Sequence, residues 1–113
     1  IVLDESKIDA LSTISGSGPA YVFYLIEQLT KAAKHHGFGD ADAALLVNET
    51  FLGAAELLVA SDKSPEALRK QVTSPNGTTE RAIARMAETD LESMFVEATD
   101  AALARARELA AEK

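Results

Sequence analysis

Residues 40–60 constrain the fold more than any other part of the sequence, because they are apolar around nearly the whole circumference of a helix. Asp40 suits an N-cap, and the apolar residues that follow are Leu45, Leu46, Val47, Phe51, Leu52, Leu57, Leu58 and Val59. A helix that is apolar on all sides is normally buried. In a chain of 113 residues, neighbouring segments can cover one face of this helix. We therefore expect a second chain to cover the remaining faces.

Most other segments also have the periodicity of helices, so the sequence predicts an all-α protein. We expect helices over residues 5–13, 19–36, 65–72 and 78–88, and a long final helix that begins at a capping box over 89–92. Ser64 before Pro65 is typical of a helix start, as is Pro19. Only the triplet at residues 1–3 has any strand character.

Composition excludes several functional classes. The net charge is −7, which disfavours contact with nucleic-acid phosphates. There is no cysteine, and the adjacent histidines His35 and His36 point about 100° apart on a helix, so we expect no metal site. No uninterrupted apolar run approaches the roughly 18 residues of a membrane span. We therefore expect a cytoplasmic protein that binds neither membrane nor nucleic acid.

The segment over residues 73–79 is the stronger candidate for a binding site. It reads Thr-Ser-Pro-Asn-Gly-Thr-Thr and precedes an expected helix start. Unpaired N–H groups and the positive end of the helix dipole favour a carboxylate or phosphate at such a place. Ser74, Thr78 and Thr79 would add hydroxyl donors, and Gly77 would allow close approach. An ordinary capped turn between two helices is the competing interpretation.

A second break, over residues 15–18, reads Ser-Gly-Ser-Gly. It lacks a preceding strand and the spacing of a dinucleotide-binding turn. A small-residue turn into a helix is more often close packing than a site.

The two breaks together resemble a known family. The stretch from Ser15 to Phe23, SGSGPAYVF, resembles the segment that opens the dimerisation domain of pyrroline-5-carboxylate reductases. The stretch from Val72 to Ile83, VTSPNGTTERAI, resembles the signature of the same family. The tetrapeptide LGAA at residues 52–55 lies between them at the expected place. The resemblance extends over essentially the whole chain.

This resemblance implies an intertwined helical bundle that dimerises, the C-terminal domain of a reductase resembling 6-phosphogluconate dehydrogenase. Residues 1–113 would then be the dimerisation and substrate-binding domain, without the N-terminal Rossmann domain that binds NADPH or NADH. The whole enzyme would reduce 1-pyrroline-5-carboxylate to L-proline in proline biosynthesis. The fragment alone would bind no cofactor and be inactive, and it would form a homodimer or a larger assembly of dimers.

The resemblance also implies roles for individual residues. Ser74, Gly77, Thr78 and Thr79 would hold the substrate carboxylate. Ser12 lies where the family often has a threonine near the ring nitrogen of the substrate, so it is a candidate proton donor. Asn76 replaces a glycine of many relatives, and asparagine tolerates a left-handed backbone.

Two alternatives to the reductase domain stay open. One is a helical dimerisation module without catalysis, and the other is a reductase-like paralogue with a different substrate. The start of the sequence at Ile1 rather than Met favours a domain cut from a longer reductase over a separate small protein. The hydroxyl-rich segment at 73–79 argues against the paralogue, because a substrate without a carboxylate would not need these donors.

Overall fold

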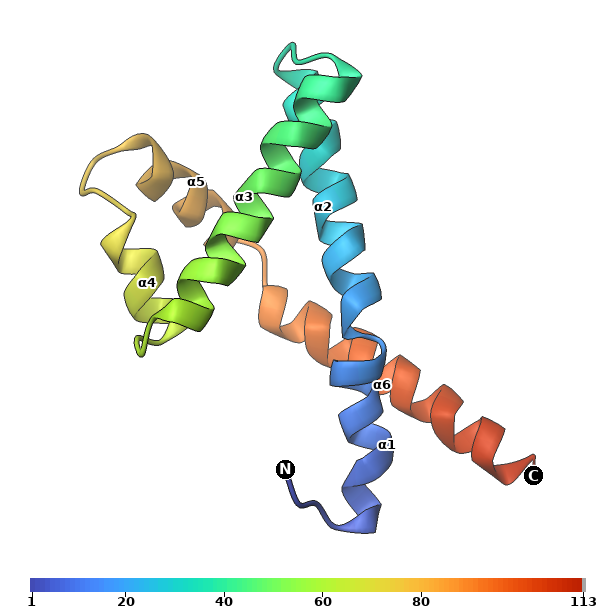
Figure 1. Cartoon of the computed structure of the whole chain (residues 1–113). Helices are drawn as coiled ribbons and strands as arrows, with labels where there is room; N and C mark the ends of the chain where they lie inside the picture. The colour runs from blue at the N-terminus through green and yellow to red at the C-terminus, as the bar shows by residue number, and fades with distance from the viewer. Residues whose placement is uncertain (113) are drawn as a thin grey trace. The chain divides into compact units, whose positions relative to one another are not determined.

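The computed structural model describes residues 1–112, and every regular element among them is helical. The prediction of an all-α fold is therefore confirmed. Figure 1 shows the elements in chain order, which are η1 (Glu5–Lys7), α1 (Ile8–Leu11), η2 (Ser12–Gly16), α2 (Gly18–His35), α3 (Asp40–Ala60), α4 (Pro65–Gln71), α5 (Thr78–Ala87) and α6 (Leu91–Ala111).

The chain forms two compact units, one from residues 1–22 with 86–112 and the other from residues 23–85. In the first unit α6 packs against α1 and η2. η1 is a 3-10 turn and η2 is a π-helical turn, so the segment before α2 changes its helical pitch twice. The expected single helix over residues 5–13 is therefore wrong in detail. The chain stays helical to Gly16, where the sequence predicted a break.

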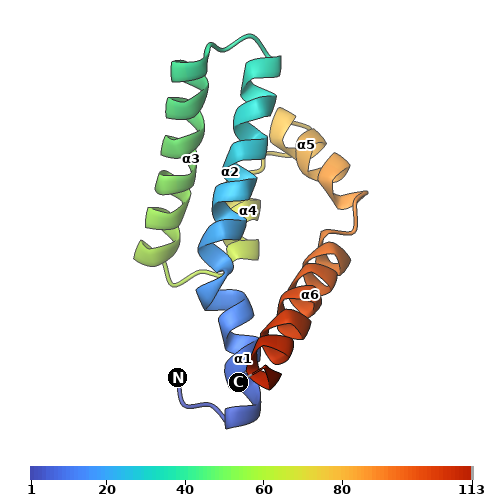
Figure 2. The ribbon, with the colours of Figure 1, turned by 90° about the vertical axis from the view of Figure 1, so that its right-hand side faces the viewer.

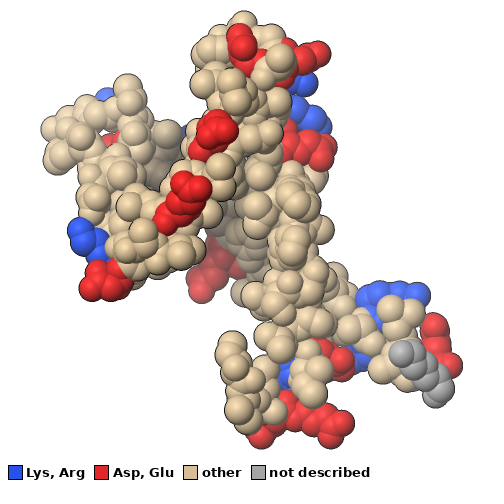
Figure 3. All heavy atoms as spheres, in the orientation of Figure 1, with Lys and Arg blue, Asp and Glu red and all other residues tan. Residues whose placement is uncertain are grey.

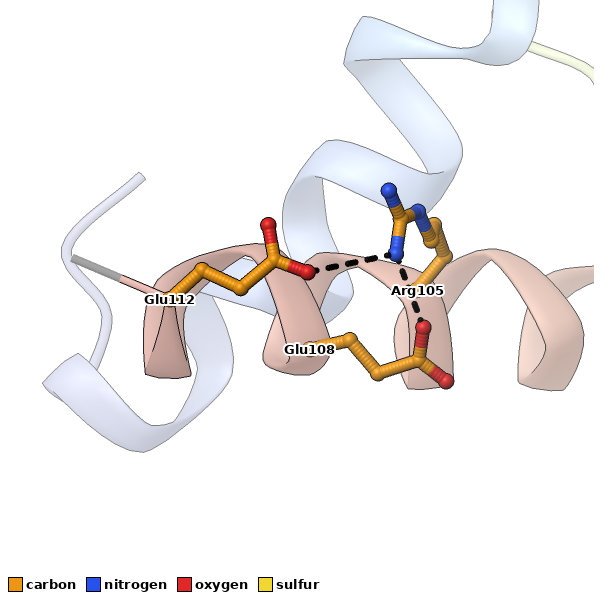
Figure 4. A network of polar contacts seen from close by, with 3 residues as sticks. All are labelled: Arg105, Glu108 and Glu112. Atoms are coloured by element: carbon orange, nitrogen blue, oxygen red, sulfur yellow. Dashed lines mark hydrogen bonds and ion pairs between the residues drawn. The ribbon is translucent and has the colours of Figure 1, made fainter.

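Two side-chain clusters fix the ends of α6. The carboxylate of Asp90 accepts hydrogen bonds from the backbone N–H of Ser93 at 3.0 Å and from its hydroxyl at 2.7 Å. Near the other end, the Arg105 guanidinium lies 3.0 Å from Glu108 and 3.8 Å from Glu112 (Figure 4). The two ion pairs of Arg105 are exposed, so each contributes little to stability.

In the second unit α2 and α3 form an antiparallel helical hairpin, visible in both ribbon views (Figures 1 and 2). Gly37 ends α2 with a φ of +100°, a conformation that glycine adopts without a Cβ clash. Its N–H donates to Lys34 and the Phe38 N–H donates to Ala33, which is the Schellman pattern. Lys34 also lies 3.3 Å from the carboxylate of Asp40 across the turn.

The surface of α3 agrees with the expectation that a single chain cannot cover this helix. Only Ala43 and Val47 are buried. The large apolar side chains that stay exposed are Leu45, Leu46, Leu52, Leu57, Leu58 and Val59. Figure 3 shows mostly uncharged surface over α2 and α3, with charges at the loop that joins them and acidic side chains also along α3.

The composition of α3 also meets a broader criterion for a membrane span. By length and composition this helix is apolar enough to cross a membrane. The sequence argument required an uninterrupted apolar run, whereas such a helix can also contain a few acidic residues. The core helix of a soluble protein meets the same criterion, so the finding is weak evidence for a membrane span.

Several expected helix ends also differ from those observed. Asp40 is the first residue of α3 and Gly39 occupies the cap position. Asp90, not Thr89, caps α6, because its carboxylate reaches Ser93. The cap at Ser64 is confirmed by a 3.1 Å bond from the Ala67 N–H to its hydroxyl. Residues 1–3 have no regular structure, so the suggestion of a strand is not supported.

Candidate functional site

The segment between α4 and α5 forms a tight turn directly before a helix start. The Gly77 N–H donates to the Ser74 carbonyl at 3.1 Å and closes the turn. Asn76 has a φ of +60°, which confirms the expectation that asparagine can take this left-handed position. The turn places Ser74, Gly77, Thr78 and Thr79 together at the N-terminus of α5.

The turn leaves several donors unpaired. Within residues 1–112, the N–H groups of Thr78 and Thr79 have no hydrogen-bond acceptor in the turn or in α4. Over the same residues, no protein atom pairs with the hydroxyls of Ser74, Thr78 or Thr79. Free N–H groups at a helix N-terminus, with the dipole behind them, favour an anion. The geometry is therefore suited to a carboxylate.

Gly77 contributes space and not a donor. Its N–H is already bonded to the Ser74 carbonyl, so it is not free to bind a ligand. A Cβ at Gly77 would lie 3.3 Å from the Ser74 carbonyl oxygen and 3.6 Å from the Ser74 Cβ. A larger side chain would therefore push the two sides of the turn apart.

Two charged residues near the turn were not among the sequence candidates. The Glu80 carboxylate accepts from the Asn76 N–H at 3.2 Å, which secures the left-handed residue from within α5. Glu80 and Arg69 also line a hollow of about 310 Å³ with Lys70, Thr73, Ile83 and Ala84. The available signal was Glu80 at the third position of the expected helix, from which a glutamate side chain can reach back to N–H groups before the helix start.

Ser12 lies in the other compact unit, at the start of η2. Its hydroxyl is exposed and donates to the Asp9 carbonyl at 2.8 Å. To donate to a ligand, the hydroxyl would have to turn away from this carbonyl. The neighbouring hydroxyls of Thr13 and Ser15 are also bonded to carbonyls one turn back, at 2.7 and 3.1 Å.

The two histidines lie at the end of α2, as the sequence predicted. His35 is the last residue of α2, and its ring meets that of His36 edge to face at 5.0 Å. Among the residues that the structure describes, no group of three or more His, Cys, Asp or Glu could hold a metal ion.

Comparison with known proteins places this turn in a family context. Residues 5–109 match the family model described as pyrroline-5-carboxylate reductase dimerisation. The chain is 44% identical over 107 residues to the pyrroline-5-carboxylate reductase of Pseudomonas aeruginosa, covering 95% of this chain and 39% of that protein. It is 37% identical over 108 residues to pyrroline-5-carboxylate reductase 2 of Bacillus subtilis, covering 96% and 39%. The chain thus spans about two fifths of the length of these relatives.

Solved structures agree with these matches. The pyrroline-5-carboxylate reductase of Coxiella burnetii superposes with a TM-score of 0.92 at 42% identity, over 96% of this chain and 40% of that one. The pyrroline carboxylate reductase of Plasmodium falciparum, solved with NADP bound, superposes with a TM-score of 0.85 at 29% identity, over 91% and 41%.

The helical architecture, the turn before α5 and the match over residues 5–109 lead to one assignment. The chain belongs to the pyrroline-5-carboxylate reductase family and corresponds to its dimerisation domain.

Proposed function

We propose that residues 1–113 are the C-terminal domain of an enzyme that reduces 1-pyrroline-5-carboxylate to L-proline in proline biosynthesis. A hydride would pass from NADPH or NADH to the imine carbon, and a proton would reach the ring nitrogen. The products would be L-proline and the oxidised nucleotide. The observation that carries this proposal is the family match over residues 5–109, which includes the hydroxyl-rich turn before α5.

The turn would hold the substrate carboxylate, which does not react. The free N–H groups of Thr78 and Thr79 and the hydroxyls of Ser74 and Thr79 are suited to its two oxygens. Holding this group would fix the imine carbon against the nicotinamide, and such positioning can lower a barrier by several kcal/mol. Ser12 would help to protonate the ring nitrogen.

The nucleotide would bind a separate N-terminal Rossmann domain. Three findings support this arrangement. This chain accounts for only 39% of the Pseudomonas relative, and the Plasmodium relative was solved with NADP bound. The all-helical domain lacks the strand and glycine-rich turn of a dinucleotide site among its described residues. The enzyme would act in the cytoplasm on a small molecule, without membrane or nucleic-acid partners.

The domain would also join two subunits in a homodimer, from which larger assemblies could be built. The exposed apolar side chains of α3 support this proposal, as does the description of the matching family. An intertwined interface of this kind buries more than about 2,000 Å².

Sedimentation of the wild type and of Leu58→Asp tests whether the domain forms a homodimer. We expect a dimer or larger species for the wild type and dissociation or unfolding for the variant, because an unpaired buried charge costs several kcal/mol. Leu58→Met, which keeps an apolar side chain of similar volume, is the matched control and should still assemble. A stable wild-type monomer would contradict the dimer.

The direct test of the activity uses the full-length protein. Purified enzyme should oxidise NADPH or NADH only when 1-pyrroline-5-carboxylate is present, with L-proline as the product. The 113-residue chain alone should give no turnover above a control without protein. Turnover by this chain would place a nicotinamide site within it and contradict the division of roles.

A further inference from the structure

The segment that presents Ser12 has an unusual backbone. η2 is a π-helical turn over Ser12–Gly16, and the Ser17 N–H donates to the Ser12 carbonyl at 2.9 Å. π turns are rare in proteins, are found mostly as single turns within α-helices and are frequent at functional sites. Because an α-helix is the common alternative, a π turn needs side chains that hold it in place.

One side chain reaches into this turn from α2. The Tyr21 hydroxyl donates to the Thr13 carbonyl at 2.7 Å, across eight residues of sequence. Thr13 is one residue after Ser12 and is 5% exposed, the only polar residue buried among those that the structure describes. Tyr21 is itself partly buried. The bond therefore ties a buried carbonyl of η2 to the first turns of α2, within a single compact unit.

The direction of the Ser12 side chain depends on this turn. Successive residues of an α-helix are about 100° apart around the axis, so relaxation of a π turn to an α turn shifts the register by about one residue. Such a shift would rotate the segment before η2, with the Ser12 hydroxyl, by about that angle relative to α2.

We infer that Tyr21 is a positioning residue for Ser12, acting through the Thr13 carbonyl to keep the π turn that aims the Ser12 hydroxyl. This inference rests on the proposed role of Ser12 in protonating the substrate. Tyr21 holds the turn and does not itself touch the substrate.

The test is a double-mutant cycle in the full-length enzyme with Tyr21→Phe, Ser12→Ala and the double variant. Phenylalanine keeps the ring and removes only the hydroxyl. We expect Tyr21→Phe to lower kcat roughly tenfold and to leave KM for 1-pyrroline-5-carboxylate within about twofold. In the Ser12→Ala background the same change should have almost no further effect on kcat. Tyr24→Phe removes the hydroxyl of an exposed tyrosine on the same helix and should behave as the wild type.

Amide hydrogen exchange over residues 13–18 reports the turn without relying on activity. We expect faster exchange in Tyr21→Phe than in the wild type or in Tyr24→Phe. Unchanged exchange or a wild-type kcat in Tyr21→Phe would overturn the inference. An equal loss of kcat with and without the Ser12 hydroxyl would also overturn it, because Tyr21 would then act independently. A wild-type kcat for Ser12→Ala alone would instead overturn the proposed role of Ser12, and the inference with it.

Discussion

Residues 12–18 and residues 73–79 have similar compositions but different hydrogen bonding. Both are rich in serine, threonine and glycine, and both precede a helix. In the first segment the hydroxyls of Ser12, Thr13 and Ser15 all donate to carbonyls of the preceding turn. In the second, the Thr73 hydroxyl donates to the Arg69 carbonyl at 2.6 Å, but the hydroxyls of Ser74 and Thr79 have no protein partner within residues 1–112.

This difference teaches that a hydroxyl-rich segment is a binding site only when its backbone leaves the donors free. A continuous helical turn provides carbonyl acceptors three and four residues back, and serine and threonine use them. In the second segment only Thr73, at the end of α4, uses such an acceptor, and the turn that follows leaves the hydroxyls of Ser74 and Thr79 without one. We therefore expect the first segment to act through Ser12 alone, whereas the second segment has free donors that can bind a ligand.

A larger side chain at Gly77, in the second segment, should have the largest effect on activity. Gly77→Val would place a branched side chain where a Cβ is already 3.3 Å from the Ser74 carbonyl oxygen. We expect kcat/KM of the full-length enzyme to fall by more than about 100-fold, because misplacement of the donors by 1 Å can cost that much. Gly77→Ala is the matched control and should lose less, since one methyl group requires only a small shift. Full activity in Gly77→Val would show that the turn is not at the active site.

Removing single donors from the second segment should have the next largest effect. Ser74→Ala and Thr79→Ala should each lower kcat/KM roughly 10- to 100-fold, because each would lose a hydrogen bond to a charged group worth about 1.5–3 kcal/mol. Steady-state kinetics with varied 1-pyrroline-5-carboxylate measures this loss. If both variants keep wild-type efficiency, the carboxylate binds elsewhere and the segment is only a turn.

The first segment should respond through a single residue. Ser12→Ala should lower kcat more than it changes KM, roughly tenfold or more, if its hydroxyl helps to move a proton. Kinetics at saturating substrate separates the two parameters. An increase in KM alone would assign Ser12 to binding.

Ser15 provides the matched test within the same segment. Its hydroxyl donates to the Leu11 carbonyl and is exposed, so Ser15→Ala should change kcat and KM by less than about twofold. A large loss of activity in this variant would mean that the backbone-bonded hydroxyls of the segment act as a group, and the contrast with Ser12 would fail.

The smallest effect should be on thermal stability and concerns Asp90, which caps the start of α6. Hydrogen bonds from the Ser93 backbone and side chain lower the pKa of Asp90 below its ordinary value of 3.8. A carboxylate with a lowered pKa in the folded state adds stability above its unfolded pKa, and this stability is lost as the pH falls through the folded value. The Tm of the wild type should thus slightly exceed that of Asp90→Asn at pH 7, and the difference should shrink as the pH falls from 3.8 through the lower folded pKa of Asp90. A difference independent of pH would contradict this assignment.

The sequence by itself determined the helices and the position of the candidate site. Apolar periodicity located α2 and α6 to within a few residues, and the long apolar stretch after Asp40 located α3. Ser64 and Asn76 were also predictable, since each belongs to a residue type suited to one local backbone geometry. The uniform apolarity of α3 indicated that a single chain would leave much of it exposed.

Only the tertiary structure decided which polar groups are already paired. Asp90 replaced Thr89 as the cap of α6, because the choice between adjacent caps depends on where the helix begins. The π turn at Ser12–Gly16 had no local signal, since Tyr21 supports it from eight residues beyond Thr13. The Gly77 N–H is likewise unavailable to a ligand, because it closes its own turn by bonding to the Ser74 carbonyl. The residue types determine which donors and acceptors a segment has, and the folded backbone determines which of them remain free for a ligand.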